Sequence, residues 1–197
     1  KKCILVPGCR EFLGYFNINK SLLNKNFIKK FYPNFYNIKI IKTGNVKIKL
    51  LTIHNYFFLC CKEYYDIVNF LDQSYLIDAD YTILLSHCPP YSVSRHGPDY
   101  IIRSILNLSK IKNKVDLFLS GHEHCYMRFD INNTPFIVNG LGGHSRYSFY
   151  TKDINLKKKY NNNQCLLYLN ISKKHIIVKL KNFKGVEIDK VIIKNKT

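Results

Sequence analysis

Two apolar segments separated by a helical pattern constrain the fold more than any other part of the sequence. Residues 81–86 (YTILLS) and 115–120 (VDLFLS) are almost continuously apolar, as expected for strands covered on both faces. Between them, residues 98–108 repeat apolar side chains at helical spacing, and Pro98 suits a first helical turn. A strand, a helix and a second strand in this order predict a crossover unit of parallel strands, and therefore an α/β sandwich.

The flanking segments extend this layered arrangement. Residues 64–77 have helical spacing, and one or two further helical turns are expected within residues 21–31. Other strands, mostly antiparallel after residue 121, are predicted at residues 2–6, 46–53, 56–61, 126–131, 135–139, 165–171, 175–180 and 186–193. The polar stretch 157–163 (KKKYNNN) is predicted to be an exposed loop. Because no internal repeat is visible, we expect residues 1–197 to form a single layered α/β domain.

The net charge narrows the range of partners. The chain has 31 Lys and Arg against 13 Asp and Glu, a formal net charge of +18, which favours phosphorylated substrates, nucleic acid or an acidic membrane surface. The lysines are scattered along every segment and outnumber the arginines, so a dedicated nucleic-acid surface is not predicted. No apolar run approaches the roughly 18 residues needed to cross a bilayer. The seven cysteines include no zinc-ribbon pairs, so they leave the cellular compartment open.

Three loops follow predicted strands at the edge where ligand sites of α/β sheets gather. His87 follows the strand 81–86, His122 and His124 follow the strand 115–120, and Cys9 and Arg10 follow the strand 2–6. Neutral imidazole is a good ligand for zinc and iron. Gly121 is expected to let the chain turn so that the rings of His122 and His124 face one cavity. The sequence therefore predicts a metal site built from these loops.

The motifs in these loops resemble those of the calcineurin-like metallophosphoesterases. Ser120-Gly-His-Glu-His124 is similar to the family's Gly-His-x-His motif, and His87 occupies the position of the preceding single-His motif. The later His96-Gly-Pro98 and Gly140–Gly143 resemble more specifically the tartrate-resistant purple acid phosphatases. The resemblance implies an αββα-type sandwich. Since the chain begins close to the third motif, we expect it to be the C-terminal part of such a domain, as a fragment or a naturally shortened protein.

The resemblance also implies a reaction. His87 and His122 would bind one metal of a pair, His124 would bind the other, and His96 would donate a proton to the leaving group or contact the phosphate. The implied chemistry is hydrolysis of a small phosphomonoester by a metal-bound hydroxide, with a pair of the iron–zinc or iron–iron type. Asp99 and Glu123 lie beside the motifs and are expected to orient the ligand imidazoles. A secreted or lumenal location is suggested by the family resemblance alone.

The chain departs from the family's third motif, which falls in the loop after the predicted strand 2–6. Gly8-Cys9-Arg10-Glu11 stands there in place of the family's Gly-Asn-His-Asp/Glu. Cys9 can bind zinc as a thiolate and Arg10 can hold a phosphate oxygen, or both positions have drifted in a site no longer used. The earlier Asp motifs of the family have no counterpart in this chain. The alternative prediction is therefore a catalytically impaired scaffold that binds a protein partner. A weaker alternative, based on the net charge of +18 and the 14% aromatic content, is a module that binds RNA or other anions.

Overall fold

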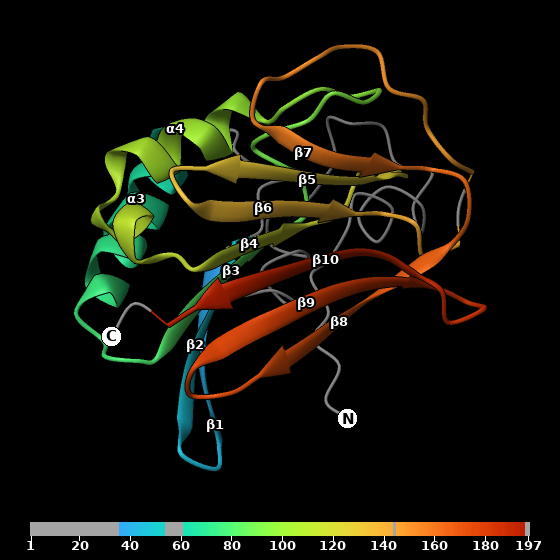
Figure 1. The fold of residues 1–197 in the computed structure, drawn as a ribbon. Coiled ribbons are helices and arrows are strands. Elements are labelled where there is room, and N and C mark those ends of the chain that lie inside the picture. Colours follow the sequence, from blue (N-terminus) through green and yellow to red (C-terminus); the bar gives the residue numbers. More distant parts are fainter. Residues whose placement is uncertain (1–35, 54–60, 144, 196–197) are drawn as a thin grey trace.

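The described strands form two sheets that pack against each other, with helices on the far side of the larger sheet (Figure 1). The computed structural model describes residues 36–53, 61–143 and 145–195. Its strands are β1 (Tyr36–Thr43), β2 (Val46–Ile53), β3 (Tyr81–Ser86), β4 (Leu117–Ser120), β5 (Tyr126–Ile131), β6 (Thr134–Asn139), β7 (Leu156–Tyr160), β8 (Cys165–Ile171), β9 (His175–Asn182) and β10 (Glu187–Lys194). Its helices are α3 (Cys61–Tyr75), α4 (Tyr100–Leu108) and the short 3-10 helix η3 (Lys110–Lys114). This confirms the predicted α/β class.

The larger sheet has the order β1-β2-β3-β4-β6-β5-β7 and contains the predicted crossover unit. Strands β2, β3, β4 and β6 are parallel neighbours, with α3 connecting β2 to β3 and α4 connecting β3 to β4. The register of β3 and β4 runs from Ile83 opposite Leu117 to Ser86 opposite Ser120. The two strands therefore end side by side, and the loops that follow them leave the sheet together.

Each face of the larger sheet contributes to a separate apolar core. On one face, side chains of α3 and α4 such as Ile67 and Ile102 pack against Leu84 and Phe118. The other face packs against the smaller antiparallel sheet, of order β10-β9-β8, whose Val178 is buried in this layer. A second helical layer, expected for an αββα sandwich, is not found among the described elements.

Two buried polar contacts fix these layers. Lys49 of β2 is only 1% exposed, and its Nζ donates hydrogen bonds to the carbonyls of Ser74 and Ile77 at the end of α3, both at 2.8 Å. Between the sheets, Asp189 of β10 accepts hydrogen bonds from Arg128 and Tyr126 of β5, at 2.7 Å each for its Oδ2. Both contacts satisfy polar groups that burial would otherwise leave unpaired.

The structure also corrects several predictions. Residues 157–160, the first part of the loop predicted at 157–163, belong to the edge strand β7. They form a strand because the backbone of β5 offers a free edge and the lysines of β7 can remain in solvent. Strand β1 was not predicted, although Gly44 (φ 56°) turns the chain tightly back into β2. Cys61 begins α3 and does not end a strand.

The strand predicted at 2–6, the helical turns within 21–31 and residues 56–60 lie outside the described residues. No described helix is long and apolar enough to cross a membrane.

Candidate metal centre

His87 and His122 meet where β3 and β4 end. Because Ser86 and Ser120 are opposite each other in the sheet, the residues that follow leave at the same edge, and the amide of Gly121 donates to the carbonyl of His87 at 3.0 Å. The side chains converge as well: His122 Nδ1 lies 3.2 Å from His87 Nε2. The structure thus brings together two histidines that are 35 positions apart in the sequence.

The turn that presents His122 has an unusual backbone. His122 has φ of 65°, a left-handed conformation that costs a non-glycine residue roughly 1–2 kcal/mol. Gly121, which was expected to make the turn, does not have a positive φ. Close backbone hydrogen bonds from Glu123 to Gly121 and from Cys125 to Glu123, both 2.7 Å, hold the strained residue. Backbone strain of this kind is concentrated at functional sites.

The donors around His122 fit a transition-metal ion. The ligand atoms of His87, Cys88 and His122 all lie within 4.8 Å of one another. Usual zinc–nitrogen bond lengths of about 2.0–2.1 Å place two imidazole nitrogens on a tetrahedral ion about 3.3–3.4 Å apart, close to the 3.2 Å observed here. Imidazole nitrogen with thiolate sulfur is a donor set that suits zinc and related ions. The same 3.2 Å separation is also a direct hydrogen bond when one ring nitrogen carries a proton.

The protonation state of His122 is favourable for ligation. Burial lowers the pKa of His122 below its ordinary value, and the nearby His96 lowers it further. The neutral imidazole therefore predominates near neutral pH. Only this neutral form has a ring nitrogen with a lone pair for a metal ion.

His96 lies on the other side of His122, held by a buried carboxylate. The ring centroids of His96 and His122 are 4.5 Å apart. Glu123 is fully buried; its Oε1 accepts hydrogen bonds from the His96 amide at 2.8 Å and from the Ser92 hydroxyl at 3.3 Å, and its Oε2 lies 3.5 Å from His96 Nδ1. Glu123 was expected to orient the ligand imidazoles, and the described contacts show it positioning His96. Asp99 accepts from the amides of Ile101 and Ile102, which caps α4.

His124 is separated from this group by a tyrosine. Its ring stacks on Tyr147 at 4.1 Å, and Tyr147 also packs edge-on against His96 at 5.2 Å. His124 Nδ1 lies 2.8 Å from the carbonyl oxygen of Ser145. A carbonyl can only accept, so Nδ1 carries the proton and Nε2 the lone pair. Metal-ligating histidines commonly use this arrangement.

The predicted site residues thus divide into three groups. His87, His122 and His96 are brought together, and His124 lies beside them behind Tyr147. Cys9 and Arg10 lie outside the described residues. Sequence reasoning missed Cys88 as a donor, although Cys88 directly follows His87. It also missed Tyr147, which lies in no recognisable motif.

The glycine loop after β6 packs directly against this centre. A Cβ at Gly140 would lie 2.1 Å from the carbonyl oxygen of Glu123, so only glycine fits here. The amide of Gly140 donates to the carbonyl of Cys125 at 3.1 Å. The close approach of the two backbones explains why residue 140, in the segment that resembles the late glycine loop of the phosphatases, is a glycine.

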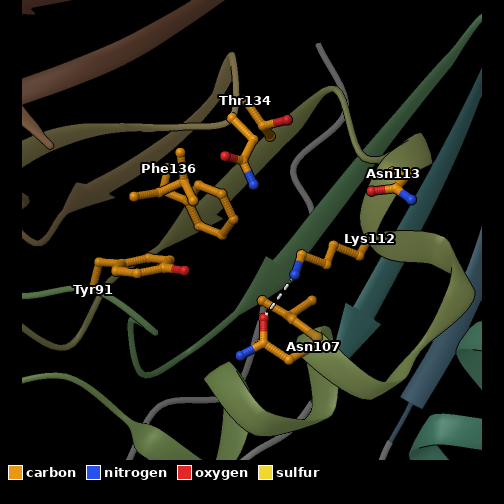
Figure 2. A pocket seen from close by; sticks show the side chains of 9 residues that line it. Tyr91, Asn107, Lys112, Asn113, Thr134 and Phe136 are labelled. Atoms are coloured by element: carbon orange, nitrogen blue, oxygen red, sulfur yellow. Dashed lines mark hydrogen bonds between the residues drawn. The ribbon is translucent and has the colours of Figure 1, made fainter.

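A separate small pocket lies at the opposite edge of the sheet. Its lining includes Tyr91, Asn107, Lys112 and Thr134, and Figure 2 shows Lys112 pointing toward Asn107. Thr134 begins β6 and bonds to the carbonyl of Val115, just before β4, so the pocket lies at the amino ends of these parallel strands. The histidines lie at the carboxyl ends. The pocket of about 110 Å³ is therefore not part of the metal centre.

Comparison with known proteins assigns the family. Residues 5–126 match the Calcineurin-like phosphoesterase family. The chain belongs to this family. Among curated proteins, this calcineurin-like phosphoesterase is similar to Purple acid phosphatase 4 of Arabidopsis thaliana and to Tartrate-resistant acid phosphatase type 5 of Oryctolagus cuniculus, with 31% identity over 74 residues in each case. The matched region spans 36% of this chain and only 22% of each relative.

Solved structures agree on the fold. GAP50, described as the anchor in the inner membrane complex of Plasmodium, superimposes with a TM-score of 0.68 at 21% identity, over 84% of this chain and 56% of GAP50. The purple acid phosphatase PPD1 of yellow lupin (Lupinus luteus) gives a TM-score of 0.60 at 18% identity, over 80% of this chain and 32% of that protein. At these identities the similarity establishes the metallophosphoesterase fold and no more.

Proposed function

We propose that this calcineurin-like phosphoesterase is a metal-dependent phosphomonoester hydrolase of the purple acid phosphatase type. The observation that carries the proposal is the convergence of His87 and His122, 3.2 Å apart at the carboxyl ends of β3 and β4, with His96 beside them. The motif order shared with the phosphatases supports the same conclusion. The substrate class is a small phosphomonoester, and the metals are of the iron–zinc or iron–iron type.

Each residue has a proposed role. His87, His122 and Cys88 would hold one ion, and His124 would hold a second through Nε2. Cys9 is proposed as a further ligand. When bound, the ions would supply Lewis acidity and would activate water as a nucleophile near neutral pH. His96 either contacts the phosphate or donates a proton to the departing oxygen, and Arg10 binds a phosphate oxygen through its guanidinium.

Glu123 prepares His96 for this role. The Glu123 Oε1 accepts a hydrogen bond from the His96 amide at 2.8 Å, and Oε2 lies 3.5 Å from His96 Nδ1, so the carboxylate holds His96 in place beside His122. The opposite edge of the ring is then directed away from the carboxylate. The buried carboxylate therefore acts through His96 and not on the substrate.

The test is hydrolysis of p-nitrophenyl phosphate by the full-length protein reconstituted with iron and zinc. His122→Ala is expected to lower the rate by a factor of about 100 or more, together with the bound metal. His175→Ala is the matched control, because His175 lies at the start of β9, outside the histidine cluster. A rate that His122→Ala leaves unchanged would rule the proposal out.

A second candidate function is a non-catalytic scaffold that binds a protein partner. The specific observation in its favour is Cys9-Arg10, which stands where the family has Asn-His. The fold is also shared with GAP50, the anchor in the inner membrane complex of Plasmodium. Under this proposal, the full-length protein binds at most one metal ion per chain and has no measurable turnover. Two bound ions with turnover would reject it.

A further inference from the structure

The outer face of the three-stranded sheet combines lysines with exposed apolar side chains. The register of β8, β9 and β10 places Lys179 opposite Lys190, and Ile177 opposite Ile192, on the same face. Tyr168 lies next to Lys179 on β8, and the ring of Tyr168 lies 6.0 Å from Lys181 Nζ. A sheet face that packs against helices is apolar, so the lysines indicate that no helical layer from the described part of the chain covers this face.

The turn between β9 and β10 presents a phenylalanine to solvent. Phe183 is 63% exposed and Val186 is 54% exposed. The turn is well ordered by hydrogen bonds, because the side chain of Asn182 accepts from the amides of Lys184 and Val186, both at 3.0 Å. Because these hydrogen bonds lie within the turn itself, the turn holds Phe183 out from the sheet without requiring contacts to the apolar core.

The charge around this turn is strongly positive. Residues 165–195 contain seven lysines, one Asp, one Glu and no arginine. Asp189 faces inward, where it binds Arg128, and Glu187 pairs with Lys179 at 2.8 Å. The outward charge is therefore carried by lysines that have long flexible stems. Such side chains can cover apolar surface while their ammonium groups reach anionic groups.

We propose that this face, defined by Leu166, Tyr168, Phe183, Val186 and Ile192 with the surrounding lysines, docks on an anionic lipid surface. Phospholipid headgroups attract the lysines, and the apolar side chains enter the boundary between headgroups and acyl chains. Exposed apolar groups at the tip of a turn gain little from a nucleic-acid backbone. The combination of lysines with exposed apolar side chains therefore fits a membrane surface better than RNA. A membrane contact also accounts for positive charge that lies away from the metal centre.

A tryptophan reporter tests insertion directly. The 197-residue chain contains no tryptophan, so Phe183→Trp in this chain introduces one tryptophan at the turn. Vesicles of phosphatidylcholine with about one third phosphatidylserine are expected to shift its emission to the blue, whereas vesicles of phosphatidylcholine alone are not. Tyr65→Trp on α3 is the matched control, because Tyr65 is similarly exposed, at 62%, on the helical side of the molecule. Its emission should not change.

Charge neutralisation tests the lysines. Lys181, Lys184 and Lys190 changed together to Gln should weaken vesicle binding about 100-fold, since each lysine near an anionic surface contributes about a fivefold factor. The control changes Lys110, Lys112 and Lys114 of η3 to Gln, which lowers the net charge equally.

An equal loss in both charge variants would show that net charge alone drives binding and would overturn the proposal. An unshifted Phe183→Trp emission in the presence of anionic vesicles would overturn it as well. If that variant binds polyuridylic acid instead, the face is a nucleic-acid surface. Neither readout depends on the metal centre or on hydrolytic activity.

Discussion

Asp189 joins the two sheets, and its removal should destabilise the protein strongly. Its Oδ2 accepts from Arg128 Nε at 2.7 Å and from Tyr126 Oη at 2.7 Å, while Oδ1 accepts from Arg128 Nη2 at 3.1 Å. The Arg128 and Asp189 side chains are only 16% and 10% exposed. Asp189→Ala leaves Arg128 charged and unpaired between the sheets. Because breaking a buried pair costs about 3–5 kcal/mol, we expect a loss of about 3 kcal/mol at this partly exposed site.

The assay is urea unfolding of wild type and Asp189→Ala at pH 7, with Asp189→Asn as the variant that keeps the shape. For a chain of this size, the same loss should lower the Tm by about 6–12 °C. Adding Arg128→Met to Asp189→Ala should restore part of the stability, since the unpaired charge is then gone. A free energy of unfolding that changes by less than about 0.5 kcal/mol in Asp189→Ala would refute the reasoning.

The pH dependence of the same pair provides a second check. Burial acts to raise the pKa of Asp189, but the hydrogen bonds from Arg128 and Tyr126 outweigh it and hold the pKa below its ordinary value. A carboxylate with a depressed pKa stabilises the fold above its unfolded pKa, about 3.9, and this contribution is lost as the pH falls through the folded value. The stability difference between wild type and Asp189→Asn should therefore shrink below about pH 4. An unchanged difference would contradict the assignment.

Three further predictions concern single positions. Lys49→Met should lower the free energy of unfolding in urea by about 1–3 kcal/mol, because buried carbonyls at the end of α3 lose their hydrogen-bond donor. Lys42→Met, on the exposed side of β1, should leave the free energy of unfolding unchanged. Gly140→Ala should cost about 1–3 kcal/mol through the clash of its Cβ with a backbone carbonyl, and Gly142→Ala, with nothing within 4 Å, should not. Cys88→Ala should lower zinc affinity about tenfold or more in a competition titration with a chelator, and an unchanged affinity would exclude the thiolate as a donor.

The sequence determined the class of the fold and the central strands. The apolar run 81–86 forms β3, and residues 117–120 of the run 115–120 form β4. Such apolar runs can be recognised without knowledge of their partners. The motifs at His87 and His122 also located the candidate metal centre, because residues after parallel strands meet at one edge of the sheet. These features depend on local pattern and on a general rule of α/β topology.

Tertiary structure alone decided the formation of strand β7 and the backbone conformation of the turn at His122. Strand β7 has three lysines in succession and becomes a strand only because β5 offers its backbone hydrogen bonds. Similarly, His122, not Gly121, takes the left-handed conformation, since the surrounding backbone hydrogen bonds fix the turn.

The partners of individual polar side chains were also set by packing. Glu123 binds His96, and Tyr147 comes between His96 and His124, through contacts between segments distant in sequence. A local pattern specifies which face of a strand is apolar. It does not specify which distant group satisfies a buried carboxylate, because that depends on how the layers come together.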